Sequence, residues 1–195
     1  MLSHRIEPME RGHQERLALI AQAVVAEAGV DFAEIARVGA TVGPGSFTGL
    51  RVGVAFAKGL ASALSAETVG VSVFEALAAD REGLVFAAID ARRDQIYLQG
   101  FNDGQALDPP RAASLEAAVL TIRAAGRAVT VIGSGAPALA AQLPGVHLVE
   151  AAWADPRVVA RLAARRAASP LKPLYLRAPD ARLPGGLPGP HADAL

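Results

Sequence analysis

The chain has 195 residues, 52% of them hydrophobic, which is enough for one or two buried cores and excludes a largely disordered protein. Its 19 Lys and Arg residues balance 19 Asp and Glu residues, and this zero net charge disfavours direct binding of nucleic acid by the chain alone. The absence of cysteine excludes disulfides and thiolate metal sites, and because the sequence has no signal core and no apolar run of about 20 residues, we expect a cytoplasmic protein that does not enter a membrane.

The first predicted elements alternate between strands and helices. Residues 3–7 have a strand pattern, and residues 14–28 have a helical pattern that ends before Gly29. Two further strands flank an almost uncharged helix, and these three elements are predicted at residues 38–42, 50–64 and 68–73. Such alternation is typical of an α/β fold.

A glycine-rich loop joins the second predicted strand to the helix that follows it. Gly43 and Gly45 supply backbone freedom on either side of Pro44, and Ser46 or Thr48 can cap the helix. Backbone N–H groups at the start of a helix can hold an anion, including a nucleotide phosphate. The same loop equally suits a tight connection between a strand and a helix.

The helix at residues 50–64 has only Arg51 and Lys58 as charged residues, whereas an ordinary surface helix has a full polar face. Small residues recur at every fourth position and form a ridge that another helix can approach closely. A partner subunit, a neighbouring helix or the chain's own domain is therefore expected to cover it. The residues expected at a partner interface, on this helix and on the one at residues 14–28, are Leu17, Ile20, Val24, Leu50, Gly53, Val54, Ala57 and Ala61.

The second half of the chain continues the alternation. Ser72 and Glu75 have capping-box spacing for a short helix through residue 79, which closes the first unit. The later strands are predicted at residues 84–90, 95–101, 129–132 and 146–149, with tight turns at 91–94 and 102–104, and the later helices at residues 114–125, 136–142 and 155–168.

Four arginines lie on the last predicted helix, three of them at fourfold spacing: Arg157, Arg161, Arg165 and Arg166. The simplest interpretation is a solvated helix face, and the alternative is a phosphate-binding stripe.

The sequence contains no complete catalytic motif. A phosphate-loop NTPase needs a lysine after the last glycine of the loop, but Leu50 follows Gly49. Ser46 lacks the flanking glycines of a serine-hydrolase elbow and is therefore interpreted as a cap rather than a nucleophile. The four histidines show no paired metal spacing.

Asp90 is the best candidate for a polar catalytic group, because it ends a predicted strand and strand ends in α/β folds often line clefts. Its alternative role is to close the following turn by accepting hydrogen bonds from backbone amides. Tyr97 and Tyr175 are compatible with a place in the core and with a binding role.

Residues 43–64, with the sequence GPGSFTGLRVGVAFAKGLASAL, resemble the signature of the TsaB (YeaZ) family, which serves in the bacterial synthesis of N6-threonylcarbamoyladenosine in tRNA. Three other segments agree with this family in chain order. Residues 13–17 resemble the start of its first helix, residues 90–97 its Asp-Ala-Arg hairpin, and residues 173–177 its Pro-x-Tyr-x-Arg motif.

The resemblance implies an actin-like ATPase (ASKHA) fold with two α/β lobes. We expect an N-terminal lobe at residues 1–80, a C-terminal lobe at 81–178 and a mobile Pro/Gly-rich tail at 179–195. The family's opening β-hairpin has no counterpart in this sequence, so the expected N-terminal lobe is incomplete, as it would be with a misassigned start codon or a truncated chain.

The resemblance also implies a non-catalytic scaffold subunit. Such a subunit binds and activates TsaD and helps to recruit the ATPase TsaE, while ATP and metal are used by the partner subunits and tRNA is reached only through the complex. A homodimer can occupy the same surface when TsaD is absent. We expect Gly53→Leu or Ala57→Glu to abolish association and to leave a folded monomer.

The alternative from another class is an actin-like phosphotransferase or hydrolase that acts on its own. Its nucleotide site would consist of Gly43, Gly45, Ser46, Thr48 and Asp90. A glycopeptidase is a third possibility, against which the missing nucleophile and metal motifs argue.

Overall fold

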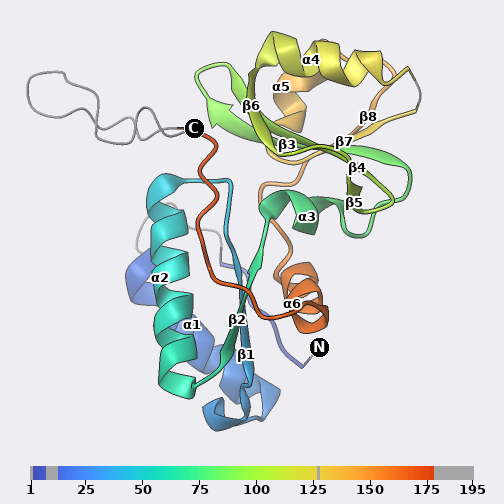
Figure 1. Ribbon diagram of the computed structural model, residues 1–195. Coiled ribbons are helices and arrows are strands. Elements are labelled where there is room, and N and C mark those ends of the chain that lie inside the picture. Colours follow the sequence, from blue (N-terminus) through green and yellow to red (C-terminus); the bar gives the residue numbers. More distant parts are fainter. Residues whose placement is uncertain (1, 8–12, 127, 178–195) are drawn as a thin grey trace, which may run out of the picture.

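The fold consists of two α/β lobes, each built around its own β-sheet (Figure 1). The computed structural model describes residues 2–7, 13–126 and 128–177, without the side chains of residues 13 and 14. The predicted tail at 179–195 therefore lies outside the described residues.

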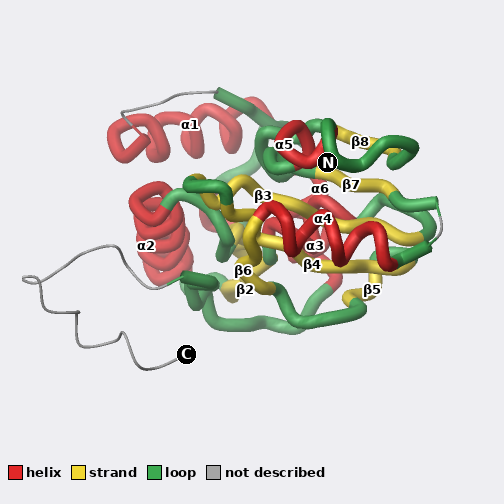
Figure 2. Tube along the Cα trace, turned by 90° about the horizontal axis from the view of Figure 1, so that it is seen from above, coloured by secondary structure: helices red, strands yellow, loops and turns green. Residues whose placement is uncertain are grey.

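The first lobe contains two parallel strands, β1 (Arg37–Thr41) and β2 (Glu67–Val71), which are joined by helix α2 (Phe47–Leu64). α2 covers one face of this sheet, and α6 (Pro156–Arg165) covers the other. Helix α1 (His13–Ala28) lies beside α2 in both views (Figures 1 and 2). One flank of the first lobe is thus formed by a pair of neighbouring helices.

Gly39 lets α6 approach the first sheet closely. A Cβ atom at this position would lie 2.5 Å from the Cβ of Ala163 on α6. Because real Cβ atoms do not come so near, only glycine fits between β1 and the helix.

The second lobe contains a six-stranded mixed sheet in the order β5-β4-β3-β7-β8, with β6 paired to β4. β3 and β4 form an antiparallel hairpin, and β3, β7 and β8 run parallel. The six strands are β3 (Leu84–Arg92), β4 (Gln95–Asn102), β5 (Gln105–Ala106), β6 (Arg111–Ser114), β7 (Thr130–Ile132) and β8 (His147–Val149).

Both faces of the second sheet are covered by helices. α4 (Leu115–Ala124) and α5 (Ala136–Ala140) pack on one face against Phe86 and Leu98, whereas α3 (Val73–Ala78) packs on the other against Val85 and Phe101. Alternate residues of β3 point into the two cores, as the pleat of a strand requires.

Most predicted elements are present within a few residues of their expected bounds. Helix starts are the most accurate, since the predicted caps are formed: Ser46 accepts a hydrogen bond from the Gly49 amide, Ser114 accepts one from the Ala117 amide, and Ser72 with Glu75 forms the capping box. The short elements β5, β6 and the 3₁₀ helix η1 (Phe32–Glu34) were not predicted, because two to four residues carry too little periodic signal.

The predicted strand at residues 3–7 is wrong, since this segment has no strand conformation. Its side chains are instead bonded to α1: Arg5 forms an ion pair with Glu27, and the Ser3 hydroxyl donates to the same carboxylate over 3.1 Å. A strand needs the edge of another strand for its backbone groups, and the contacts of this segment are with a helix.

α6 ends at Arg165 rather than at residue 168 as predicted. The Arg37 guanidinium from β1 donates to the carbonyls of Ala163, Ala164 and Arg166, which lack helical partners at this end. Arg166 is already extended, with φ −98° and ψ 155°. A cation from another element thus satisfies the end of the helix.

The chain returns to the first lobe after the second. Beyond α6, the Ser169 amide donates to the Thr68 carbonyl over 2.8 Å, and the side chain of Leu171 is buried against Val54 and Ala57 of α2. The predicted boundary at residue 80 stays a prediction, but α6 and the segment after it are packed on the first sheet.

Candidate functional site

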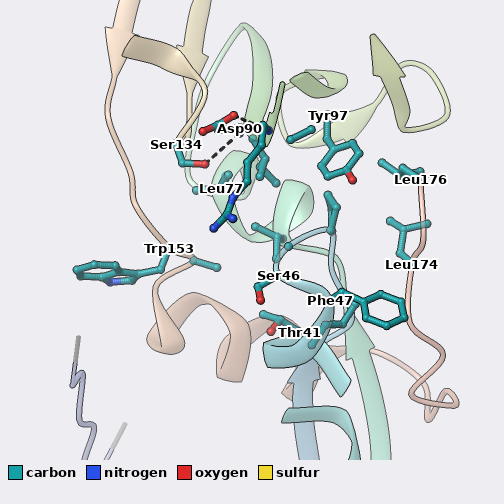
Figure 3. A pocket seen from close by; sticks show the side chains of 18 of the residues that line it. Thr41, Ser46, Phe47, Leu77, Asp90, Tyr97, Ser134, Trp153, Leu174 and Leu176 are labelled. Atoms are coloured by element: carbon teal, nitrogen blue, oxygen red, sulfur yellow. Dashed lines mark hydrogen bonds between the residues drawn. The ribbon is translucent and has the colours of Figure 1, made fainter. Parts of the chain in front are cut away.

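A cleft of about 890 Å³ lies between the two lobes. Figure 3 shows Ser46 and Phe47 on one side of it, and Asp90 and Ser134 on the opposite side. Trp153 flanks a third side, while Leu174 and Leu176 lie across from it. The volume is within the range of about 300–1,000 Å³ that is typical of small-molecule sites.

The glycine-rich loop forms the cleft wall that the first lobe contributes. Gly43 has φ +105°, a conformation that side-chain-bearing residues rarely adopt, and its carbonyl accepts a hydrogen bond from the Val73 amide over 2.8 Å. Gly45, Ser46 and Thr48 follow it on the cleft surface. The loop therefore serves as a tight connection, and it also brings the start of α2 to the cleft.

Asp90 closes the β3–β4 hairpin. Its carboxylate accepts a hydrogen bond from the Arg92 amide over 2.7 Å, and its own amide donates to the Ser134 hydroxyl over 3.2 Å. Arg92, Arg93 and Asp94 all have positive φ, so the turn is tightly bent. The structure supports the turn-closing role for Asp90, although the residue also lines the cleft.

An aromatic and guanidinium cluster, which the sequence did not indicate as a unit, lies at the mouth of the cleft. The rings of Phe47 and Tyr175 are 5.3 Å apart between centroids, and the Arg51 guanidinium lies 3.9 Å from the Phe47 centroid. Arg51 Nε also donates to the Tyr175 hydroxyl over 3.3 Å. Because Tyr175 is more than a hundred positions from Phe47 and Arg51, only the fold reveals the cluster.

The predicted interface residues fall into two groups. Val54, Ala57 and Ala61 are buried, with exposed fractions of 4%, 5% and 3%, and pack within the first lobe. These three residues support α2 from inside rather than at its surface, because the small-residue ridge faces the chain's own sheet. The half-buried residues that remain are Leu17, Ile20, Val24, Leu50 and Gly53.

A different set of small residues on α2 faces solvent: Ala55, Gly59 and Ala63 are exposed and recur at every fourth position. The fourfold spacing in the sequence is common to this stripe and to the buried one, so it did not indicate which of the two faces outward.

The neighbouring helix α1 is also exposed on one side. Ala18 and Ala26 are exposed two turns apart with Gln22 between them, and Leu19 beside them is 55% exposed.

A second hollow of about 610 Å³ lies where α1, α2 and α6 meet around β1. Leu17, Gly53 and Phe56 line it from α1 and α2, and Val159 lines it from α6. Gly53 is therefore next to open space, and nothing lies within 4 Å of a Cβ atom built on it.

Three of the four arginines predicted on the last helix face carboxylates. Arg157 and Arg161 on α6 are paired with Asp155 and Asp80, and Arg166, which follows α6, is paired with Glu75. The hydrogen bond from Arg157 holds the pKa of Asp155 below its usual value. A phosphate-binding stripe is not supported, since these three guanidinium groups already have anionic partners.

Among the described residues, no three His, Asp or Glu side chains are grouped so that they could hold a metal ion. Within the same residues, no helix is both long and apolar enough to cross a bilayer.

Known proteins resemble this chain over most of its length. The family model of TsaD, tRNA N6-adenosine threonylcarbamoyltransferase, matches residues 5–126. The solved structure of YeaZ from Pseudomonas aeruginosa superposes with a TM-score of 0.70 at 25% identity, over 84% of this chain and 85% of that one. The chain belongs to the TsaB (YeaZ) branch of this family.

Two curated relatives complete the comparison. An uncharacterized protein of Mycobacterium tuberculosis is 33% identical over 191 residues, which cover 93% of this chain and 83% of the relative. The tRNA threonylcarbamoyladenosine biosynthesis protein TsaB of Escherichia coli is 35% identical over 92 residues, or 45% of this chain and 40% of that protein. The expected family and α/β class are thus confirmed, and the YeaZ match supports the actin-like architecture that the TsaB resemblance implied.

Proposed function

We propose that this chain is a non-catalytic subunit of the machinery that makes N6-threonylcarbamoyladenosine in tRNA. It binds and activates TsaD through the solvent-facing sides of α1 and α2 and helps to recruit TsaE. The chain itself takes no cofactor: ATP and metal act in the partner subunits, and tRNA is met only in the assembled complex.

The observation that best supports this proposal is the incomplete burial of α1. None of its residues 15–28 is fully buried, although the helix contains leucine, isoleucine and two valines. The packing of α1 on α2 leaves Leu19 in solvent, next to the helix that carries the exposed small-residue stripe. A stripe of this kind lets another helix approach within the short interaxial distances of well-packed helix pairs, so a helical surface of a partner fits here.

The proposed partner is TsaD because the family model that matches this chain describes TsaD itself. Two proteins of one fold can pair through equivalent helices about a pseudo-twofold axis, as identical subunits do about a true one. For the same reason a homodimer can form over this surface when TsaD is absent.

The second candidate is an enzyme that acts alone on a nucleotide in the cleft. The location of Gly45, Ser46, Thr48 and Asp90 around one hollow favours it. The Asp90 carboxylate argues against an enzyme, because it already accepts a hydrogen bond from the hairpin backbone. Calorimetry with ATP and magnesium distinguishes the two: tight binding and turnover by the isolated chain would support the enzyme, whereas no heat signal would support the subunit.

The interface is tested by substituting Gly59, which lies exposed on α2 with nothing within 4 Å of a Cβ atom built on it. Gly59→Leu adds bulk where two helix backbones come close, and we expect it to weaken TsaD binding roughly tenfold or more. Titration of TsaD with the purified variant, by calorimetry or surface plasmon resonance, measures the change.

The matched control is Ala124→Leu, which places the same side chain on an exposed position of α4 in the other lobe. The control keeps wild-type affinity if α1 and α2 form the interface. Unchanged affinity in Gly59→Leu would remove the outer face of α2 from the proposal.

A further inference from the structure

The aromatic and guanidinium cluster at the mouth of the cleft holds Arg51 in a defined orientation. Its guanidinium lies 3.9 Å from the centroid of the Phe47 ring, and its Nε donates to the Tyr175 hydroxyl over 3.3 Å. The two rings lie 5.3 Å apart between centroids and so support each other. A long side chain that is already ordered loses little conformational entropy when it binds a partner.

The outer end of the Arg51 guanidinium has no anionic partner in the part of the chain that the structure describes. There, neither of its Nη groups donates a hydrogen bond, and no carboxylate lies within ion-pair distance. By contrast, Arg37, Arg111 and Arg161 each bind a carboxylate. Because two Nη groups can donate to both oxygens of one carboxylate, Arg51 is oriented to bind an acidic group from outside.

The charge of α2 has one sign. The helix carries Arg51 and Lys58 and contains no acidic residue. Both cations are exposed, and within the described residues Lys58 has no ion-pair partner either. The positive end of the helix dipole lies at the N-terminal end of α2, near Arg51. A surface that covers this end of α2 therefore has to bring negative charge, because burying a cation without a partner is costly.

The cluster continues the outer face of α2. Arg51 lies one turn before Ala55 and therefore shares a side of the helix with the exposed Ala55 and Gly59. The rings beside it offer apolar surface, with exposed fractions of 39% for Phe47 and 38% for Tyr175. Tyrosine and arginine are enriched among the few residues that supply most of the binding energy of protein interfaces.

We propose that Arg51 is the anchor of the partner interface and binds an Asp or Glu carboxylate of the partner subunit. The carboxylate oxygens accept from the two Nη groups, while the apolar part of the acidic side chain packs on the Phe47 and Tyr175 rings. The inference rests on the proposed function and deepens it, because it states the chemistry of the TsaD surface. That surface is acidic next to the start of α2, and it approaches closely over the small residues from Ala55 onward.

A second copy of this chain is a poorer partner for Arg51. In a symmetric pair, each copy would bring Arg51 and Lys58 to the shared face, and like charges across an interface oppose association. Glu15, which is exposed near the start of α1, is an acidic side chain that a second copy could offer to Arg51. Substitution of Glu15 therefore separates the two partners.

The test compares the two cations of α2 by calorimetric titration of TsaD from the same organism. We expect Arg51→Gln to weaken binding at least about tenfold at about 0.1 M salt, and to make the affinity less sensitive to added salt. The matched control Lys58→Gln removes the same charge from a side chain that no aromatic ring holds, so its effect should stay below about threefold. Arg51→Lys keeps the charge but loses the planar fork, and should remain weaker than wild type.

The outcomes distinguish this inference from the proposed function. Weakened binding in Gly59→Leu but wild-type binding in Arg51→Gln would refute the anchor and keep the interface. Wild-type binding in both variants, or no binding of TsaD by the unchanged chain, would refute both.

Two further results would also refute the anchor. One is an equal loss of affinity in Lys58→Gln and Arg51→Gln, which would indicate only a general attraction between charges. The other is weaker self-association of Arg51→Gln and of Glu15→Gln in analytical ultracentrifugation with unchanged TsaD affinity, which would assign the carboxylate to a second copy.

Discussion

Ala57 is buried between α2 and the first sheet, where only 5% of its surface is exposed. A glutamate at this position would place an unpaired charge among the buried apolar side chains of Val54 and Leu171, where the hollow around β1 meets the core. We predict that Ala57→Glu lowers the free energy of unfolding by about 3–5 kcal/mol, the range seen for uncompensated buried charges. Urea denaturation followed by circular dichroism measures this loss.

This outcome replaces the expectation that Ala57→Glu leaves a folded monomer. Gly53, one turn earlier, is the informative neighbour, because it lies beside the hollow around β1 and has space for a side chain. Gly53→Leu should therefore change the free energy of unfolding by no more than about 1 kcal/mol. An equally large loss of unfolding free energy in Ala57→Glu and Gly53→Leu would contradict the assignment of Ala57 to the buried side of α2 and of Gly53 to open space.

At the residue scale, the sequence was most informative for side chains whose role depends only on their neighbours in the chain. Ser46, Ser72 and Ser114 were predicted as caps and are caps, because a cap depends only on the few residues that follow it. The burial of Ala57 and the exposure of Ala55 were not predictable, since both are small and apolar and only the fold decides which side meets the sheet. The Phe47–Tyr175 contact joins distant residues and could not be inferred either.

Helix α6 depends on its N-cap. The Asp155 carboxylate accepts from the Arg157 amide over 2.8 Å and also from the Arg157 side chain. We predict that Asp155→Ala lowers stability by about 0.5–2 kcal/mol, the usual value for losing such a cap. Thermal unfolding of the variant at pH 7 measures the effect, and Asp155→Asn, which keeps a capping oxygen, is the matched control.

The same cap predicts a pH dependence. The pKa of Asp155 is lowered in the folded chain by the hydrogen bond from Arg157, so folding favours the charged carboxylate. The stabilisation is complete above the unfolded pKa, near 3.8, and is lost as the pH falls through the lower folded pKa. The stability difference between wild type and Asp155→Asn should therefore narrow in acid, and a difference that widened below pH 4 would contradict this role.

At the element scale, long helices with caps and apolar strands were predictable, because their periodicity extends over several turns or pleats. Residues 3–7 show the limit of this reasoning. Their alternation reads as a strand, but the conformation follows from Glu27, whose carboxylate holds Ser3 and Arg5 against α1. A pattern states which conformation a segment can take, whereas the available partner decides which one it takes.

The two lobes are joined through the returning segment that contains Leu171. This side chain is 1% exposed and packs on Val54 and Ala57 under α2. We predict that Leu171→Ala costs about 2–5 kcal/mol through the cavity that it leaves. Native-state hydrogen exchange should show the loss at the Ser169 and Leu174 amides, which bind the first lobe, before the amides of β3 and β4 respond.

The matched control is Leu139→Ala, because Leu139 is equally buried but belongs to the second lobe. Its effect should be concentrated on β3, β4 and β7 and should spare the Ser169 amide. Equal acceleration of exchange at every amide in both variants would mean that the lobes unfold as one unit.

At the scale of the whole molecule, the α/β class followed from the sequence, but the path of the chain between the lobes did not. Nothing in the pattern of α6 indicates that it packs on β1 rather than on the nearer β8. Its contact with the first sheet depends on Gly39, a single residue without a side chain more than a hundred positions earlier.

The return of α6 and Leu171 to the first sheet also bears on how the protein is made. Ribosomes deliver a polypeptide from its N-terminus at about 5–20 residues per second, and early domains ordinarily fold while later ones are still being synthesised. Here the lobe that emerges first must wait for α6 and Leu171, which are translated after the whole second sheet. During this interval the sheet face that α6 covers and the part of α2 that Leu171 covers are exposed, and the nascent chain should depend on chaperones until Leu171 has been translated.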